Sequence, residues 1–367
     1  MGLPARLRSI VPVVTGPALR KRERRRRRPQ ETVRSFTATF LMTAVMAAFL
    51  SPLAHSVSIS VKSPEQITRA RSPIWPGEPV TFEYQGEELD VYDVPIAGGI
   101  RQLALFEPGR RESQFIDPAA PEEGPITWQG SWRRLDPSWV FSPKLSNYGD
   151  VWRIIDYPRL LFNTVAIALI GMVGTLVSCT LVAYGFARFR FPGKGLLFTL
   201  LISTIFLPAA VTLIPTYMIM VKLGWVGSWL PLLVPTFLAN AYDVFLLRQY
   251  FMTIPRELDE AAEIDGAGPL RTLVSVILPQ AWPAIIAVGI FHFVYSWNDF
   301  FGPLIYLSGR PELQPISVAL QRFNGIYYTN PAYIQAGTLM ALVIPVGLFL
   351  LFQRFFTRGI VITGVER

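Results

Sequence analysis

Six long apolar segments constrain this chain more than any other feature of its sequence. A helix that crosses the roughly 30 Å hydrocarbon layer of a bilayer needs about 20 predominantly apolar residues. Segments of this kind lie at 35–58, 160–186, 196–221, 228–248, 281–307 and 334–356. Most are apolar around the whole helix circumference, and hydrophobic residues make up 51% of the chain against 16% charged. The sequence therefore predicts an all-α membrane protein with six transmembrane helices.

Lysine and arginine residues gather on one side of the predicted spans. The basic groups near span ends are Arg24 to Arg28; Arg188, Arg190 and Lys194; Arg248, Arg256 and Arg271; and Arg354, Arg358 and Arg367. Basic residues flank spans on the cytoplasmic side. Both termini and the loop at 249–280 are therefore predicted to be cytoplasmic, whereas 59–159 and 308–333 face outward. The expected location is the cell membrane.

The N-terminal tail accounts for the net charge of +8. Residues 1–34 hold eleven lysines and arginines against Glu23 and Glu31. The run from Arg20 to Arg28 is of a kind that can bind nucleic acid, but a basic run directly before a span more simply holds the N-terminus inside and contacts anionic lipid. No nucleic-acid partner is predicted. A cleaved signal peptide is the alternative for this end, yet the apolar stretch is longer than the usual signal core, which favours a retained helix.

The segment at 59–159 has the composition of a soluble domain. Three stretches in it combine alternation with β-branched or aromatic residues between turn signals: 80–84, 89–94 and 101–106. We expect a small extracytoplasmic insert that contains β-strands. Trp128, Trp132 and Trp139 suit either a small core or the lipid headgroups, and a sugar-binding platform is the third and less favoured alternative.

The loop at 249–280 is a charged stretch between two spans, which places it in water at the membrane face. Residues 257–264 suit a short amphipathic helix with its acidic residues near the positive N-terminal end. Gly266 can adopt the left-handed conformation that ends such a helix. Pro269 is expected to start a second helical piece that leads back to the membrane. Small alanines allow a partner to approach the backbone, and Glu260 is an acceptor for a partner's arginine or lysine.

The residue order in this loop resembles the EAA loop of importer permeases of the ATP-binding-cassette (ABC) class. The matching positions are Glu260, Ala261, Ala262, Asp265, Gly266, Ala267, Leu278 and Pro279. Residues 183–194 and 296–300 are also similar to the MalG-type branch of carbohydrate ABC permeases. The resemblance covers most of 35–58 and 145–367. The insert departs from it, because the family's segment between the first two spans is usually shorter.

The resemblance implies a type I ABC importer permease fold and a set of partners. These are a second homologous permease subunit, a cytoplasmic ABC ATPase dimer and an extracytoplasmic solute-binding protein. In that family the helix that carries Glu260 to Gly266, the coupling helix, fits a groove on the ATPase and passes on its motion. The implied domain order is a basic tail (1–34), a first transmembrane helix (35–58), the insert (59–159), a five-helix core (160–356) and a cytoplasmic tail (357–367).

Nucleotide, metal and redox chemistry are not expected on this chain. The sequence has no Gly-x-x-x-x-Gly-Lys-Ser/Thr phosphate loop, so ATP and Mg should bind the partner ATPase and no cofactor should bind here. Cys179 is the single cysteine, which excludes an intrachain disulfide. His55 and His292 are too few and too separate to indicate a metal site. We therefore expect a transport subunit rather than an enzyme.

Polar residues inside spans mark translocation paths often enough to be candidates. Asn240, Asn298 and Asp299 are the three that we assign to a path. The predicted function is the inward movement of a sugar or sugar derivative by alternating access, coupled to ATP hydrolysis on a partner. The alternatives are an importer of another solute, such as an amino acid, a peptide or a glycerol phosphate ester, and a membrane-anchored sensory or binding protein.

Overall fold

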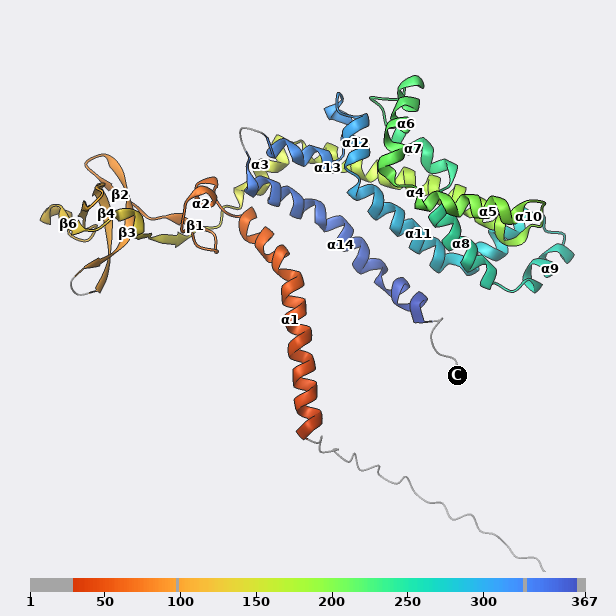
Figure 1. Cartoon of the computed structure of the whole chain (residues 1–367), viewed down its shortest axis with the longest axis horizontal. Coiled ribbons are helices and arrows are strands. Elements are labelled where there is room, and N and C mark those ends of the chain that lie inside the picture. The colour runs from red at the N-terminus through yellow and green to blue at the C-terminus, as the bar shows by residue number, and fades with distance from the viewer. Residues whose placement is uncertain (1–28, 97–98, 326–328, 362–367) are drawn as a thin grey trace, which may run out of the picture. The chain divides into compact units, whose positions relative to one another are not determined.

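The computed structural model of this chain describes residues 29–96, 99–325 and 329–361. The arginine run at Arg24 to Arg28 and the residues from 362 onward lie outside the described residues. The chain divides at Leu53 into two units. The first holds most of helix α1 (Pro29–Ser60), and the second holds the end of that helix, the β-containing insert and all other described helices (Figure 1).

Five helical segments of the described chain are long and apolar enough to cross a membrane. They are Arg34–Ser60, Tyr157–Arg188, Leu230–Thr253, Pro269–Asn298 and Pro331–Gln353. A sixth span arises if Lys194–Phe206 and Ala210–Lys222 count together, but these two helices bend by 102°. The predicted span 196–221 is thus broken in its middle. The break lies at Pro208, which has no N–H to donate and keeps Leu207 out of the helical conformation.

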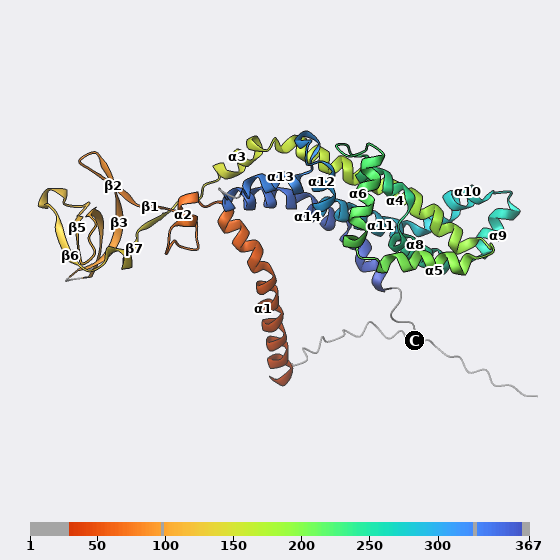
Figure 2. The same cartoon turned by 45° about the horizontal axis from the view of Figure 1, so that its top comes forward.

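The β-containing insert separates α2 from α3, and the later helices of the second unit follow one another with short connections. Their bounds are α2 (Pro64–Thr68), α3 (Ser146–Ile154), α4 (Tyr157–Arg188), α5 (Lys194–Ser203), α6 (Ala209–Lys222), α7 (Leu230–Leu233), α8 (Ala241–Thr253), α9 (Glu257–Ile264), α10 (Pro269–Thr272), α11 (Leu278–Asn298), α12 (Phe301–Tyr306), α13 (Ile316–Ala319) and α14 (Pro331–Val361). Helix α4 packs along α8 and α11 (Figures 1 and 2). Their shared core includes Cys179, Val244, Leu247, Ile277 and Val288.

The helix that leads into α11 begins earlier and ends earlier than the predicted span 281–307. It runs from Pro269 through α10, a π-helical turn (Leu273–Ile277) and α11 to Asn298. Pro279 therefore lies inside a continuous helix that begins at Pro269. Proline removes one intrahelical hydrogen bond, and the wider π-helical turn that precedes it accommodates that loss.

Two glycines allow close packing on α4. A Cβ atom at Gly174 would lie 2.4 Å from Thr236 Oγ1 and 2.7 Å from the Phe237 ring. A Cβ atom at Gly171 would lie 2.8 Å from His292 Nε2. Small residues at such positions let neighbouring backbones approach, as is usual between membrane helices.

We expect Gly174→Ala to destabilise the folded chain by about 1–3 kcal/mol, because the added methyl group overpacks this contact. Thermal unfolding of the purified protein in detergent measures the loss. Gly185→Ala is the matched control on the same helix, since a Cβ atom there meets nothing within 4 Å. Equal unfolding temperatures for the two variants would contradict the assigned contact.

The insert is built on antiparallel strands. The larger sheet has the order β2-β3-β4-β5-β6 with β7 paired to β3, and a separate two-stranded ribbon pairs β1 with β8. Their bounds are β1 (Gly77–Pro79), β2 (Thr81–Tyr84), β3 (Glu87–Ile96), β4 (Gly99–Glu107), β5 (Glu112–Ile116), β6 (Ile126–Gln129), β7 (Asp136–Pro137) and β8 (Trp139–Phe141). The strands predicted at 80–84, 89–94 and 101–106 are confirmed as β2, β3 and β4.

Two of the three tryptophans discussed above belong to the core of the sheet. The Trp128 ring packs edge-on against Phe115 with centroids 6.3 Å apart, and Trp132 packs against Tyr92 at 6.0 Å. Val94, Leu103 and Phe115 are fully buried beside them. Of the alternatives left open by the sequence, the structure selects the core for these two side chains.

Candidate functional site

Helix α9 displays one face to solvent and packs with the other. Ala262 is 8% exposed, whereas Ile264 is 86% exposed, and Leu258 and Ala261 are exposed as well. Acidic residues occupy the first turn, near the positive end of the helix dipole. Ala262 therefore serves the packing of the helix, and the exposed surface of α9 consists of Leu258, Ala261 and Ile264 with the neighbouring glutamates.

Gly266 ends α9 in the predicted left-handed conformation, with φ at +76°. The Gly266 N–H donates to the Glu263 carbonyl at 3.0 Å, and the Ala267 N–H donates to the Ala262 carbonyl at 2.9 Å. This pair of bonds is the Schellman motif, which satisfies carbonyls at the end of a helix. The chain then turns toward α10 without a further loop.

Arg188 ties α9 to the end of α4. Its Nη2 lies 3.2 Å from Asp259 Oδ2 on α9 and donates to the Ile254 carbonyl, which follows α8, at 3.0 Å. The two side chains are only 8% and 22% exposed. Loss of one member of such a buried pair leaves an uncompensated charge and is strongly destabilising. One guanidinium thus joins three helices.

Sequence reasoning missed this contact. Asp259 was not among the predicted site residues, and Arg188 was noted only as a flanking charge. A cavity of about 310 Å³ lies next to the pair, lined in part by Tyr184, Arg256 and Glu260. The remaining predicted positions lie around it or beyond it: Asp265 and Gly266 are exposed, Ala267 lines the cavity, and Leu278 and Pro279 lie further along the next helix.

A second cavity, of about 560 Å³, lies between α4, the α7–α8 segment and α11. Its polar and aromatic lining includes Asn240, Tyr242, Asp243, His292, Tyr295, Asp299 and Tyr306. Asn240 caps α8 by accepting from the Asp243 N–H at 2.9 Å, and its amide donates to the Asp243 carboxylate at 2.6 Å. Asp299 accepts from the Gly302 N–H at 3.2 Å. Two of the three predicted path residues, Asn240 and Asp299, therefore share one cavity.

Asn298 does not belong to that lining. Its side chain is exposed and its amide donates to the Val294 carbonyl of its own helix at 2.8 Å. The residue is the last of α11, so the chain turns away directly after it.

The helix beside the cavity is broken at Ala239, which has a φ of +59°. Positive φ is strained for alanine and persists where the surrounding structure fixes it. Ser178 of α4 supplies that support, because its hydroxyl donates to the Thr236 carbonyl at 3.0 Å and accepts from the Ala239 N–H at 3.2 Å. Broken helices occur at membrane depth where neighbouring side chains satisfy the freed backbone groups. No local sequence signal marks this break.

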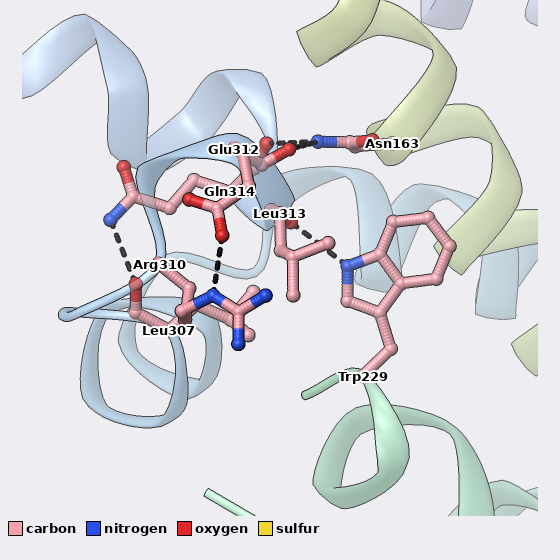
Figure 3. Close-up of polar contacts among 7 residues, drawn as sticks. All are labelled: Asn163, Trp229, Leu307, Arg310, Glu312, Leu313 and Gln314. Atoms are coloured by element: carbon pink, nitrogen blue, oxygen red, sulfur yellow. Dashed lines mark hydrogen bonds and ion pairs between the residues drawn. The ribbon is translucent and has the colours of Figure 1, made fainter. Parts of the chain in front are cut away.

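The loop after α12 is held against the start of α4. The Asn163 amide donates to the carbonyls of Glu312 and Gln314 at 2.9 and 3.0 Å, and Trp229 Nε1 donates to the Leu313 carbonyl at 2.9 Å (Figure 3). Arg310 donates to the Glu312 carboxylate, which holds the pKa of that carboxyl below its usual range. The base of this loop is therefore fixed to the helical core.

Asn163→Leu is expected to lower the stability of the folded chain by about 1–3 kcal/mol, because it removes the donor from two loop carbonyls. Asn163 is 3% exposed, so water cannot readily replace the amide. Thermal unfolding in detergent is again the measurement. Gln280→Leu serves as control, since Gln280 is exposed and its side-chain amide donates to the Val276 carbonyl of its own helix. An unchanged unfolding temperature for Asn163→Leu would show that Asn163 does not hold the loop against α4.

Comparisons with known proteins agree with this geometry. Residues 179–360 match the family described as binding-protein-dependent transport system inner membrane component. An osmoprotective compounds uptake permease protein of Synechocystis sp. is 32% identical over 240 residues, which cover 65% of this chain and 80% of that protein. An sn-glycerol-3-phosphate transport system permease protein of Rhizobium meliloti is 34% identical over 221 residues, which cover 59% and 77%.

Among solved structures, a bacterial ABC transporter involved in the import of the acidic polysaccharide alginate has a similar fold. The TM-score is 0.64 at 19% identity, and the match covers 90% of this chain and 98% of that chain. The predicted insert, 59–159, comprises more than a quarter of the 367 residues. Only about a tenth of this chain lies outside the match, so part of the insert must lie within it. The likeness of fold therefore extends into the insert, which the sequence had set apart from the family.

Apolar spanning helices, a charged loop between two late spans and a polar cavity at membrane depth define a membrane transport subunit. The chain belongs to the family of binding-protein-dependent transport system inner membrane components, the permeases of ABC importers. Its relatives are permease subunits, and the ATPase of such a transporter is a separate subunit. The predicted type I importer fold and the predicted class of protein are thereby confirmed.

Proposed function

We propose that this permease carries a neutral, polyhydroxylated solute, a sugar or sugar derivative, into the cell. The lining of the 560 Å³ cavity supports this choice. Tyr242, Tyr295 and Tyr306 offer hydroxyls and ring faces, and Asn240 offers an amide. Arginine and lysine are the side chains that pair with a phosphate group by charge. None of the described residues that line the cavity is either of these, whereas Asp243 and Asp299 are acidic.

The same proposal includes the partners and the orientation. A second, homologous permease would complete the path, and an extracytoplasmic solute-binding protein would deliver the solute. The coupling helix α9 would face the cytoplasm and dock on an ABC ATPase dimer, which binds ATP and Mg. The exposed apolar face of α9, flanked by Glu257, Glu260 and Glu263, suits a groove with basic residues at its rim. Both termini would then be cytoplasmic.

Uptake by the complete transporter in proteoliposomes tests the solute. We expect ATP-dependent uptake of a neutral sugar or sugar derivative in a labelled panel, and no uptake of sn-glycerol 3-phosphate. Preferential uptake of the phosphate ester would overturn the assignment. Uptake of amino acids or peptides alone would do the same.

Tyr295→Ala tests the cavity itself. Loss of one hydroxyl contact and one ring face should raise the half-saturating solute concentration about tenfold, which corresponds to ~1.4 kcal/mol. The measurement is concentration-dependent uptake at saturating ATP. Asn298→Ala is the control, because Asn298 lies outside the lining, and its uptake should remain unchanged. If Asn298→Ala reduces uptake and Tyr295→Ala does not, Asn298 contacts the solute and Tyr295 does not.

A further inference from the structure

The segment before β1 and the strand β8, which pairs with β1, expose large apolar side chains. Ile74 is 83% exposed, Phe141 is 67% exposed and Trp75 is 42% exposed. The Trp75 and Phe141 rings lie 6.3 Å apart. We name Ile74, Trp75 and Phe141 the neck cluster. Unlike Trp128 and Trp132, these side chains do not belong to the core of the larger sheet.

Backbone geometry places the two rings on the same side of the ribbon. Gly77 pairs with Phe141, and a Cβ atom at Gly77 would lie 2.5 Å from Trp75 Cζ3. The absence of a side chain at Gly77 therefore lets the Trp75 ring lie over the strand next to Phe141. Alternation sends Glu78 and its partner Val140 to the opposite face. The side that carries the two rings is thus distinct from the side that carries Glu78 and the exposed Val140.

Hydrogen bonds from α2 and from the end of the first spanning helix hold the neck in place. The Gln66 side chain is fully buried, donates to the Trp75 carbonyl at 2.8 Å and accepts from the Gly77 N–H at 3.1 Å. Lys62 Nζ donates to the Pro73 carbonyl at 2.7 Å. The Ser58 hydroxyl, in the last turns of α1, donates to the Ile74 carbonyl. The neck cluster therefore follows the position of the α1 end.

The other strand of the ribbon has a matching anchor. The Lys144 N–H donates to the Val61 carbonyl at 2.8 Å. The Asn147 amide of α3 donates to the carbonyls of Ser60 and Lys62 at 2.8 and 2.9 Å. Helix α4, which begins at Tyr157, follows α3 directly. Both strands of the ribbon are thus connected through the short helices α2 and α3 to spanning helices, α1 before β1 and α4 after β8.

The length of α1 sets the level of the neck. Its apolar segment, Arg34–Ser60, has 27 residues. At about 1.5 Å per residue it spans roughly 40 Å, which is the hydrocarbon layer together with the headgroup regions. The last turns of the helix, and hence Ser58, then lie among lipid headgroups. Tryptophan and other aromatic residues are enriched at that level.

We infer that the neck cluster is a lipid-binding surface that enters the headgroup region of the leaflet on the side of the insert. The occupant is phospholipid rather than a protein, because the cluster continues the lipid-exposed end of α1 at the level where aromatic side chains favour the interface. The neck would thereby fix the height of the β-containing insert above the membrane. This role does not depend on which solute is carried.

Fluorescence quenching in lipid nanodiscs tests the inference on the complete transporter. Phe141→Cys is labelled with an environment-sensitive fluorophore in a complex in which no other cysteine is accessible. Cys179 is fully buried and does not compete. Nanodiscs that contain phosphatidylcholine with a nitroxide near the headgroup should reduce the emission about twofold or more, and a nitroxide near the acyl chain end should reduce it less.

Ile100→Cys provides the matched control. Ile100 is 74% exposed and lies on β4 of the larger sheet, not on the neck. A fluorophore at this position should emit equally in nanodiscs with and without the nitroxide lipid. Ile74→Cys provides a second probe if the Phe141 variant fails to assemble. Equal quenching at Phe141, Ile74 and Ile100 would overturn the inference. Shielding of the labels at Phe141 and Ile74 by the second permease, and not by lipid, would overturn it as well. Neither outcome bears on solute uptake.

Discussion

Replacing Arg188 by alanine is expected to produce the largest loss of stability of any single change considered for this chain. The guanidinium contacts Asp259 on α9 and the Ile254 carbonyl after α8, and the pair is almost buried. Removal of one member of a buried ion pair costs about 3–5 kcal/mol, because the remaining charge is shielded from water and no longer has a counterion. Thermal unfolding of the purified chain, together with uptake by the transporter, should show the loss.

Two further variants separate this effect from a general loss of charge. Arg188→Ala combined with Asp259→Ala removes both charges and should regain most of the lost stability, since an apolar replacement of a buried pair is often close to neutral. Arg190→Ala removes an exposed arginine two residues away and should change little. If the double variant is as unstable as the single one, the ion pair is not the tie between α4 and α9.

Gly266→Pro is expected to uncouple ATP hydrolysis from transport. Proline fixes φ near −65°, but residue 266 has a φ of +76° and donates its N–H to the Glu263 carbonyl. The end of α9 must therefore rearrange and displace the exposed face. We expect solute uptake to fall at least about tenfold, the equivalent of ~1.4 kcal/mol, because the displaced face no longer fits the groove of the ATPase. Parallel assays of uptake and of solute-stimulated ATP hydrolysis measure the coupling.

The control for this change is Gly268→Ala. Gly268 has an ordinary φ of −74°, and a Cβ atom there meets nothing within 4 Å. Coupled transport should therefore remain intact. Glu260→Lys reverses an exposed charge of α9 and should weaken ATPase association without a change in the unfolding temperature. Normal coupling in both Gly266→Pro and Glu260→Lys would exclude α9 as the docking element.

The sequence predicted those features that depend on local patterns. Long apolar runs give the spanning helices, the alternation at 89–94 gives strand β3, and Gly266 gives the end of α9. Each of these follows from a few neighbouring residues, because length, alternation and backbone conformation are local properties. The charge pattern of the coupling loop is local in the same way.

Features that depend on distant residues escaped prediction. Arg188 and Asp259 are 71 positions apart in sequence, and nothing near either residue indicates the other. The break at Ala239 depends on Ser178 of another helix, and the neck depends on the buried Gln66 side chain. Asn298 appeared equivalent to Asp299 because they are adjacent, yet only Asp299 lines the cavity once α11 ends between them.

The central claim is that the exposed face of α9 docks on the ATPase. Site-directed cross-linking tests it most directly: Ala261→Cys lies in the middle of that face, and a short bifunctional reagent would join it to a cysteine in the groove of the ATPase. We expect a cross-linked permease–ATPase product from Ala261→Cys and none from Ile100→Cys. An intact, ATP-hydrolysing complex that yields no product at Ala261, at any groove position of the ATPase, would contradict it.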